Sequence, residues 1–232
     1  MKSNVLNSAA ALTLIAGAAT AGGIQRDGDR SQILFEKGEN YLEFSATTVS
    51  PNISSSSATL AGSTANITKN FQNFHLGYKR DVSDQLTFAL LAQELVGADV
   101  AYPAGTAFFA GNTAEIGSLA VTGLLKYQFN DRFSAYGGLR VQSLKGNVSI
   151  TPALGPAYAL SVDNDYQTGY VLGAAYEIPD IALKIALTYE PEIEHEFNDN
   201  AGNPFNVKIP QAATLHVQSG VAQNTIVFGS AR

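Results

Sequence analysis

The sequence predicts an all-β protein, namely a transmembrane antiparallel β-barrel, and three observations carry this prediction. Segments that alternate apolar and polar residues recur along the chain after residue 40. The connections between them alternate between tight turns and loops of roughly twenty residues. Only 15% of the residues are charged, whereas about a quarter are charged in an average globular protein. A sheet of this composition has little charged surface to offer to water.

The first 21 residues have the pattern of a secretory signal peptide. Lys2 supplies the positive charge, an apolar stretch runs from Ala9 to Ala19, and Ala19-Thr20-Ala21 forms a small-residue cleavage site. The alternative is a short buried helix. No later segment reaches the roughly 18 uninterrupted apolar residues of a membrane helix. We therefore expect an exported chain that enters a membrane, if at all, through β-strands.

Nine alternating segments are predicted to be strands, with ends uncertain by about two to four residues: 40–50, 71–80, 85–97, 118–129, 133–146, 165–178, 181–190, 211–219 and 225–232. Most are near the ten or so residues that a tilted strand needs to cross a bilayer. The tight turns are 81–84, 130–132, 179–180 and 222–224, and the long loops are 51–70, 98–117, 147–164 and 191–210. Outer-membrane barrels have short turns on the periplasmic side and long loops outside, which predicts the orientation.

The segment 133–143 shows what each face of these strands would contact. Leu139 and Val141 share one face, whereas Arg140 and Gln142 share the other. A soluble sandwich would bury the apolar face against a second sheet, and a membrane barrel would turn it toward lipid. The loop pattern favours the barrel, which predicts a polar lumen lined by Lys79, Lys126, Tyr136, Arg140, Gln142 and Glu177. Aromatic residues near the tight turns predict a girdle at one bilayer interface, formed by Tyr78, Tyr127, Phe129, Phe133 and Tyr176.

Four stretches resemble the FadL/TodX family of outer-membrane transporters for long-chain fatty acids and other hydrophobic compounds: 22–45, 97–103, 126–143 and 189–232. The resemblance implies a fourteen-stranded barrel in the outer membrane of a Gram-negative bacterium, with an N-terminal segment inside the lumen. It also implies passive transport, in which ligands are captured at extracellular loops and released sideways through the wall. The expected organisation is a signal peptide over 1–21, a short hatch-like periplasmic segment over 22–39, and a partial barrel over 40–232.

Three features depart from that family pattern. The N-terminal segment has no Asn-Pro-Ala element, so hatch-based gating is not predicted by a motif. Leu95-Val96-Gly97 stands where members often have Pro-Phe-Gly, so a strand kink there is not predicted either. Nine strands is an odd number, and the last segment lacks a terminal aromatic residue, whereas single-chain bacterial barrels have even strand numbers. We therefore expect the sequence to be the N-terminal part of a longer protein.

Candidate sites for metals and catalysis are weak in this sequence. Glu190, Glu192, Glu194 and Glu196 alternate as if on one strand face, but carboxylates so spaced lie ~7 Å apart, which favours a solvated face over a cation site. His75, His195 and His216 lie on separate segments, which favours polar lining over a metal or a catalytic triad. There is no Cys and no nucleotide-binding or hydrolase motif. We expect neither catalysis nor a cofactor.

The loop 101–111 is the candidate for ligand capture. Tyr102, Phe108 and Phe109 place three aromatic rings on an otherwise polar rim, which suits an apolar ligand. The alternative is that the rings fold back and cap the barrel mouth. The predicted function is passive transport of long-chain fatty acids or other hydrophobic small molecules by a monomer embedded in outer-membrane lipid. A general porin or structural barrel is the alternative and a membrane-embedded lipid hydrolase the third possibility, and the net charge of −6 argues against nucleic acid as a partner.

Overall fold

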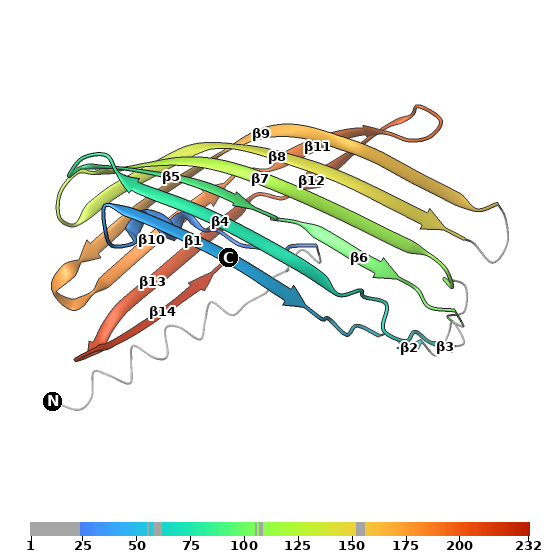
Figure 1. Ribbon diagram of the computed structural model, residues 1–232, viewed down its shortest axis with the longest axis horizontal. Coiled ribbons are helices and arrows are strands. Elements are labelled where there is room, and N and C mark those ends of the chain that lie inside the picture. The colour runs from blue at the N-terminus through green and yellow to red at the C-terminus, as the bar shows by residue number, and fades with distance from the viewer. Residues whose placement is uncertain (1–23, 55, 58–61, 105, 107–108, 152–155) are drawn as a thin grey trace.

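The protein is an antiparallel sheet curled into an arc (Figure 1). The computed structural model describes residues 24–54, 56–57, 62–104, 106, 109–151 and 156–232, so the predicted signal peptide lies outside the described residues. The sheet has ten strands in the order β1-β4-β5-β7-β8-β9-β10-β13-β14, and β6 pairs with β7 beside that path. Along this path the strands follow one another in chain order, as in an up-and-down antiparallel sheet, and the predicted fold class is confirmed.

The strands of the arc are β1 (Asn40–Val49), β4 (Phe71–Asp81), β5 (Leu86–Gln93), β6 (Gly97–Ala101), β7 (Thr113–Gln128), β8 (Phe133–Ile150), β9 (Tyr158–Ile178), β10 (Leu183–Glu190), β13 (Ala212–Ala222) and β14 (Thr225–Ala231). Two small hairpins lie outside it: β2 (Ser56–Ser57) with β3 (Gly62–Ser63), and β11 (Ile193–Asn198) with β12 (Pro204–Ile209). Two 3₁₀ turns complete the elements: η1 (Ser31–Phe35) and η2 (Pro179–Ile181). All nine predicted strands are present, although the strand predicted over 85–97 ends at Gln93 and β6 lies mostly in the segment that was predicted to be the loop 98–117.

The three central strands are longer than the sequence predicts. They reach 16, 18 and 21 residues in β7, β8 and β9, and their added ends lie at the long-loop end, where Thr113 pairs with Ser149 and Val148 with Leu160. These ends continue the alternation of apolar and polar residues: Val148 lies between Asn147 and Ser149, and Ser161 lies between Leu160 and Val162. The prediction is therefore wrong about these ends, which it assigns to the loops 98–117 and 147–164.

The convex and concave faces of the arc have opposite chemistry. Large apolar side chains point outward, and Leu139 is 75% exposed. Polar side chains point inward, and Lys79 and Gln142 are 2% and 0% exposed. Soluble proteins bury apolar residues and expose charged ones, so this pattern is typical of a sheet whose outer face contacts lipid.

The two ends of the arc differ as the loop lengths predict. The tight turns gather at the left-hand end of Figure 1 and the long connections at the other. In the turn between β7 and β8, the side chain of Asn130 accepts hydrogen bonds from the backbone N–H groups of Arg132 and Phe133, which explains why Asn begins this turn. Near the same end, the rings of Tyr127 and Phe129 lie 5.2 Å apart. Among the described residues, no helix is long and apolar enough to span a membrane.

Candidate ligand cavity inside the curved sheet

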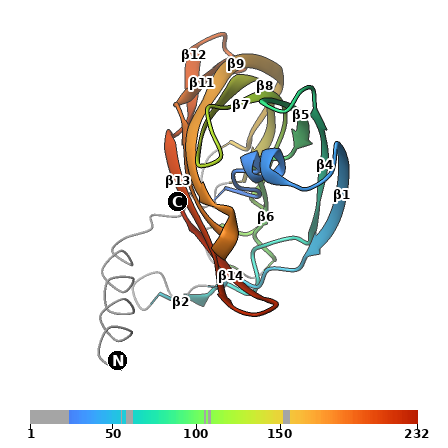
Figure 2. The same ribbon diagram turned by 90° about the vertical axis from the view of Figure 1, so that its left-hand side faces the viewer.

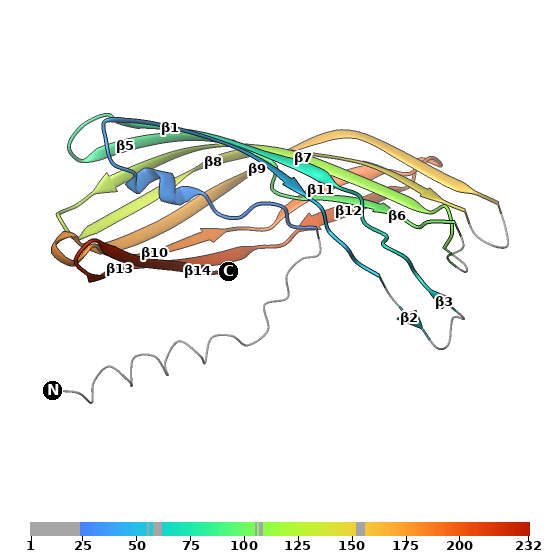
Figure 3. The same cartoon turned by 60° about the horizontal axis from the view of Figure 1, so that its bottom comes forward.

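An N-terminal segment (residues 24–36) lies on the concave side of the arc, and Figure 2 shows η1 enclosed by the curled strands. Ile33 and Leu34 of η1 are buried in a cluster with Leu91, Leu124 and Val171 from the wall. Figure 3 shows that the segment runs along the inside of the sheet from the tight-turn end toward the middle. No Asn-Pro-Ala element is needed for this placement, because apolar residues of η1 supply the contact.

Three side chains of the N-terminal segment, those of Arg26, Asp29 and Ser31, form polar contacts with the wall. Arg26 forms ion pairs with Glu94, at 2.6 Å, and with Asp99. Asp29 Oδ2 lies 3.0 Å from His216 Nε2 on β13. Ser31 shares a hydrogen bond of 3.0 Å with Thr188 on β10. The segment is thus bonded to both sides of the arc.

Tyr136 lies between η1 and the wall, and a glycine on the wall makes room for its ring. A Cβ atom at Gly173 on β9 would lie 2.2 Å from the Tyr136 ring, so the ring rests directly on the glycine backbone. In this position the Tyr136 hydroxyl bonds Thr188 at 2.8 Å, and the ring packs edge-on to Phe35 at 5.8 Å. The predicted lumen residue Tyr136 therefore lies beneath the N-terminal segment.

The wall is interrupted between β5 and β6, where the sequence predicts a continuous strand. Gln93 pairs with Ala120 and Gly97 with Gly117, so residues 94–96 oppose only 118–119. Leu95 and Val96 leave the sheet and become buried on the concave side. Arg26 N–H donates to the Leu95 carbonyl at 2.9 Å. The kink occurs without proline, because these two apolar residues pack inside and the N-terminal segment bonds their backbone.

The hairpin of β11 and β12 folds against the concave face, a feature that the sequence analysis missed. Phe197 packs in a cluster with Leu95, Leu144 and Ala120, and a Cβ atom at Gly169 of β9 would lie 2.7 Å from Ile193. Ile193, His195 and Phe197 are buried. Their alternation with Glu192, Glu194 and Glu196 was the signal that could have revealed the strand.

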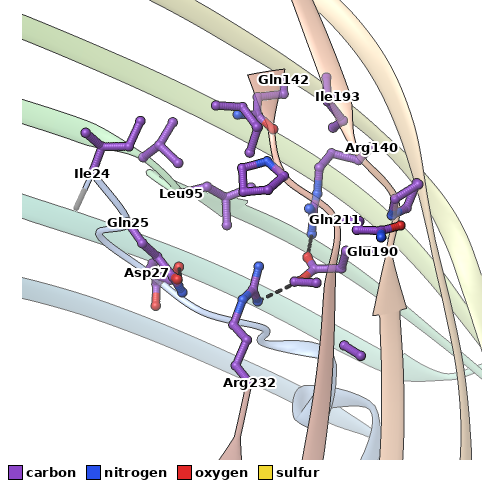
Figure 4. Close-up of a pocket in the computed structure, with 16 residues that line it drawn as sticks. Ile24, Gln25, Asp27, Leu95, Arg140, Gln142, Glu190, Ile193, Gln211 and Arg232 are labelled. Carbon is purple, nitrogen blue, oxygen red and sulfur yellow. Dashed lines mark hydrogen bonds and ion pairs between the residues drawn. The ribbon is translucent and has the colours of Figure 1, made fainter. Parts of the chain in front are cut away.

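A cavity of about 460 Å³ lies between the N-terminal segment, the interrupted wall and this hairpin (Figure 4). Its lining is largely apolar and includes Ile24, Leu95, Val96, Ile193 and Ile209. Its polar part comes from Gln142 and Arg140 on β8, from Glu190 and Arg232, and from Gln25, Asp27 and Gln211. A mostly apolar cavity with a few polar groups at one part is typical of small-molecule sites.

Arg140, Glu190 and Arg232 form one ion-pair network at the polar part of this cavity. Glu190 Oε1 lies 2.6 Å from Arg140 Nη2, and its Oε2 lies 2.6 Å from Arg232 Nη1. Arg140 Nε also donates to Thr122 Oγ1 at 3.0 Å. Figure 4 shows both arginines pointing toward the carboxylate. The charge of Arg140 is therefore compensated inside the protein.

The remaining predicted lumen residues lie on the concave face near the tight turns. Lys79 donates to the Gly38 carbonyl at 2.6 Å and to Asp81 at 2.5 Å. Lys126 is half-buried, with its Nζ 4.5 Å from the Phe35 ring centroid. Glu177 is half-buried and pairs with Lys184 in the backbone register. Of the six residues, only Arg140 and Gln142 line the cavity.

The predicted capture residues occupy the loop after β6. The rings of Tyr102 and Phe109 lie 5.4 Å apart, and Phe109 is 42% exposed. Phe108 lies outside the described residues. The cavity and this loop are separate, since neither ring lines the cavity.

Each histidine has a carboxylate partner. His75 lies 2.5 Å from Glu43, His195 lies 3.0 Å from Asp165, and His216 contacts Asp29. In the acidic run, Glu192 and Glu194 pair with Lys208 on the hairpin surface, whereas Glu190 is buried beside Arg140. The four glutamates therefore do not share one face, because Pro191 separates β10 from β11. Within the described part of the chain, no group of three or more acidic, His or Cys residues could hold a metal ion.

Acidification is expected to loosen the N-terminal segment through Asp29. Burial alone would raise the pKa of Asp29, but hydrogen bonds from His216, Thr188 and Ser31 lower it below its usual value. A carboxylate with a lowered pKa stabilises the fold above its unfolded pKa, about 3.9, and loses that contribution as the pH falls through the folded value. The protection factors of the η1 amides, which correct for the slower intrinsic exchange at low pH, should therefore fall below about pH 4.

Asp29→Asn should remove this pH dependence, because the amide keeps its shape and does not titrate. Asp131→Asn, in the exposed turn between β7 and β8, is the matched control and should leave it unchanged. Equal acid sensitivity of exchange in the Asp29→Asn variant and the unaltered protein would show that another group controls the segment.

Two solved structures are similar to this chain. One is a Pseudomonas aeruginosa FadL homologue, with a TM-score of 0.57 and 16% sequence identity over 71% of this chain and 49% of the other. The second is the Pseudomonas putida toluene transporter TodX, with a TM-score of 0.53 and 11% identity over 89% of this chain and 66% of the other. No family model matches the sequence, and no curated protein matches it either.

These similarities support the predicted family resemblance at the level of the fold. The chain spans about half the length of the Pseudomonas aeruginosa protein and 66% of TodX. The curled antiparallel sheet accordingly corresponds to part of each of those structures. The chain has the fold of the FadL homologue and of TodX, over those portions of their lengths.

Proposed function

We propose that this protein is an outer-membrane barrel that lets hydrophobic small molecules, long-chain fatty acids among them, cross passively. The observation that carries the proposal is the cavity of about 460 Å³, which is mostly apolar although many of the side chains buried on the concave face are polar. A water-filled porin needs no such lining, because its solutes stay hydrated. TodX, which shares the fold, is a transporter of toluene, itself a hydrophobic molecule.

The proposed route for such ligands runs from the outer loop to the cavity. In this proposal the protein acts as a monomer in a Gram-negative outer membrane, with its tight turns in the periplasm and its long loops outside. The Tyr102–Phe109 ring pair then lies on the outer side, where an apolar ligand would first bind. The cavity lies further in, next to the N-terminal segment (residues 24–36) that occupies the lumen.

Removing the ring pair tests the capture step. Each ring, when fully covered by a ligand, contributes roughly 1.5 to 3 kcal/mol of apolar burial, so Tyr102→Ser with Phe109→Ser should reduce capture of a long-chain apolar ligand more than tenfold. Uptake of a radiolabelled fatty acid by cells that produce the protein measures the loss. Permeation of small polar solutes should not change, because they do not depend on apolar contact.

The matched control removes a second pair of rings at the opposite end, Tyr127→Ser with Phe129→Ser. These rings lie 5.2 Å apart on the lipid side of the tight-turn end, so their loss should leave capture intact in protein that has folded. If the protein is a general porin, transport should not change after the loss of either pair of rings. Unchanged fatty-acid uptake after loss of the outer pair would therefore contradict the proposed route.

A further inference from the structure

Gln142 is a buried polar side chain without a partner at the edge of the cavity. It is 0% exposed, and its Nε2 and Oε1 atoms have no hydrogen-bond partner among the described residues. Its neighbour across the strands, Gln167, is different, because the Gln167 amide donates to Asp165 at 3.0 Å. A buried amide costs free energy when both of its polar groups stay unpaired. A ligand group that forms hydrogen bonds with Gln142 would therefore recover this free energy.

The charged groups beside Gln142 are already paired with one another. Glu190 forms an ion pair with Arg140 through one oxygen and with Arg232 through the other. Asp27, on the far side of the cavity, pairs with Arg30 at 3.0 Å. An anionic head group entering here would lose its water without finding a free cation, and it would face the Glu190 carboxylate. Moving a charge out of water without a partner is strongly unfavourable.

A hydroxyl group fits the open amide better than a carboxylate does. It can donate to Gln142 Oε1 and accept from Gln142 Nε2, whereas an ionised carboxylate can only accept. The apolar body of such a molecule would lie against Leu95, Val96 and Ile193, which line the same cavity. A volume of about 460 Å³ is within the range of roughly 300 to 1,000 Å³ found for ligand pockets.

We propose that this cavity binds apolar molecules with an uncharged hydrogen-bonding head group, such as alcohols, more tightly than carboxylates. In this proposal Gln142 forms the hydrogen bonds that recognise the head group. The inference rests on the proposed function and adds the chemistry of the ligand at the inner site. Fatty acids could still be captured at the outer loop, but in this proposal they do not bind the cavity in ionised form.

Octanol, octanoate and octane share an eight-carbon chain and differ in the head group. Their affinities therefore distinguish recognition of a hydroxyl, recognition of a carboxylate and binding of the apolar chain alone. Binding to the protein in phospholipid nanodiscs is measured by calorimetry at neutral pH, with empty nanodiscs as the reference. Octanol should bind more than tenfold tighter than octanoate, since the carboxylate loses hydration without a partner. Gln142→Leu should weaken octanol binding roughly fivefold, by the loss of its hydrogen bonds, and should leave octane unchanged.

Gln167→Leu is the matched control, on the adjacent strand in the paired position. Its amide is already used by Asp165, so this variant should keep octanol affinity and lose stability. Gln142→Leu should do the opposite, because it removes an unpaired buried amide. Lower stability of Gln142→Leu with unchanged octanol affinity would assign Gln142 a structural role and overturn the inference. Octanoate binding as tightly as octanol would also overturn it, whereas failure of all three probes to bind would contradict the proposed function itself.

Discussion

Glu190→Gln is expected to lower the free energy of unfolding by about 3–5 kcal/mol, the loss typical of breaking a buried ion pair. The Glu190 carboxylate holds two arginines, at 2.6 Å each, and the Arg140 side chain is only 9% exposed. Without the carboxylate, Arg140 keeps one hydrogen bond to Thr122 and stays buried with an uncompensated charge. Urea unfolding in lipid vesicles, followed by tyrosine fluorescence, measures the change.

Glu192→Gln is the control for this prediction, two residues further along the chain. Its ion pair with Lys208 at 2.9 Å joins side chains that are 45% and 56% exposed, so the loss should be about 0–1 kcal/mol. A similarly small loss in both variants would show that water reaches Glu190 and Arg140. The cavity would then be an aqueous passage, and the selection against carboxylates would lose its physical basis.

Leu139→Arg is expected to lower the free energy of unfolding in a bilayer by about 2–4 kcal/mol, the cost of a cation on a lipid-facing strand near the midplane. Leu139 is 75% exposed on the convex face of β8. It lies six residues from Phe133 at the tight-turn end of that strand, which is about half of the ten residues that a tilted strand uses to cross a bilayer.

In a soluble protein the same substitution would cost little, because an exposed arginine is well hydrated. Val82→Arg is the control: Val82 is 59% exposed, but it lies in the turn after β4, where the expected cost near the bilayer interface is about 0–1 kcal/mol. Equal, small effects at the two positions would contradict a lipid-facing convex surface.

The sequence predicts the wall of this molecule well and its interior poorly, for a physical reason. Strand positions and faces follow from local alternation, as at Leu139 and Arg140, and from turn residues such as Asn130. The course of Leu95 and Val96 depends instead on contacts with Arg26 and Phe197, which lie far away in sequence. Such packing has no local period.

The candidate site shows the same division. The alternation along β8 predicts that Gln142 and Arg140 face the lumen, and both residues line the cavity in the structure. The regular alternation of the glutamates predicts that Glu190 belongs to a solvated acidic strip. Pro191 breaks that strip, and the salt bridge from Glu190 to Arg140 joins residues fifty positions apart, which alternation cannot reveal.

The contact between Asp29 and His216 has a consequence for the order of folding. It joins residues 187 positions apart. Most pairs in the sheet instead join strands that follow one another along the path of the sheet, so the loops that they close are shorter. Contacts between residues far apart in sequence form late, because the chain must lose the conformational entropy of a long loop before the contact contributes favourable free energy. The N-terminal segment is synthesised before the sheet, yet its bond to His216 can form only when β13 is in place. Pulsed hydrogen exchange should accordingly protect η1 after β7 and β8, and earlier protection of η1 would rule out this order.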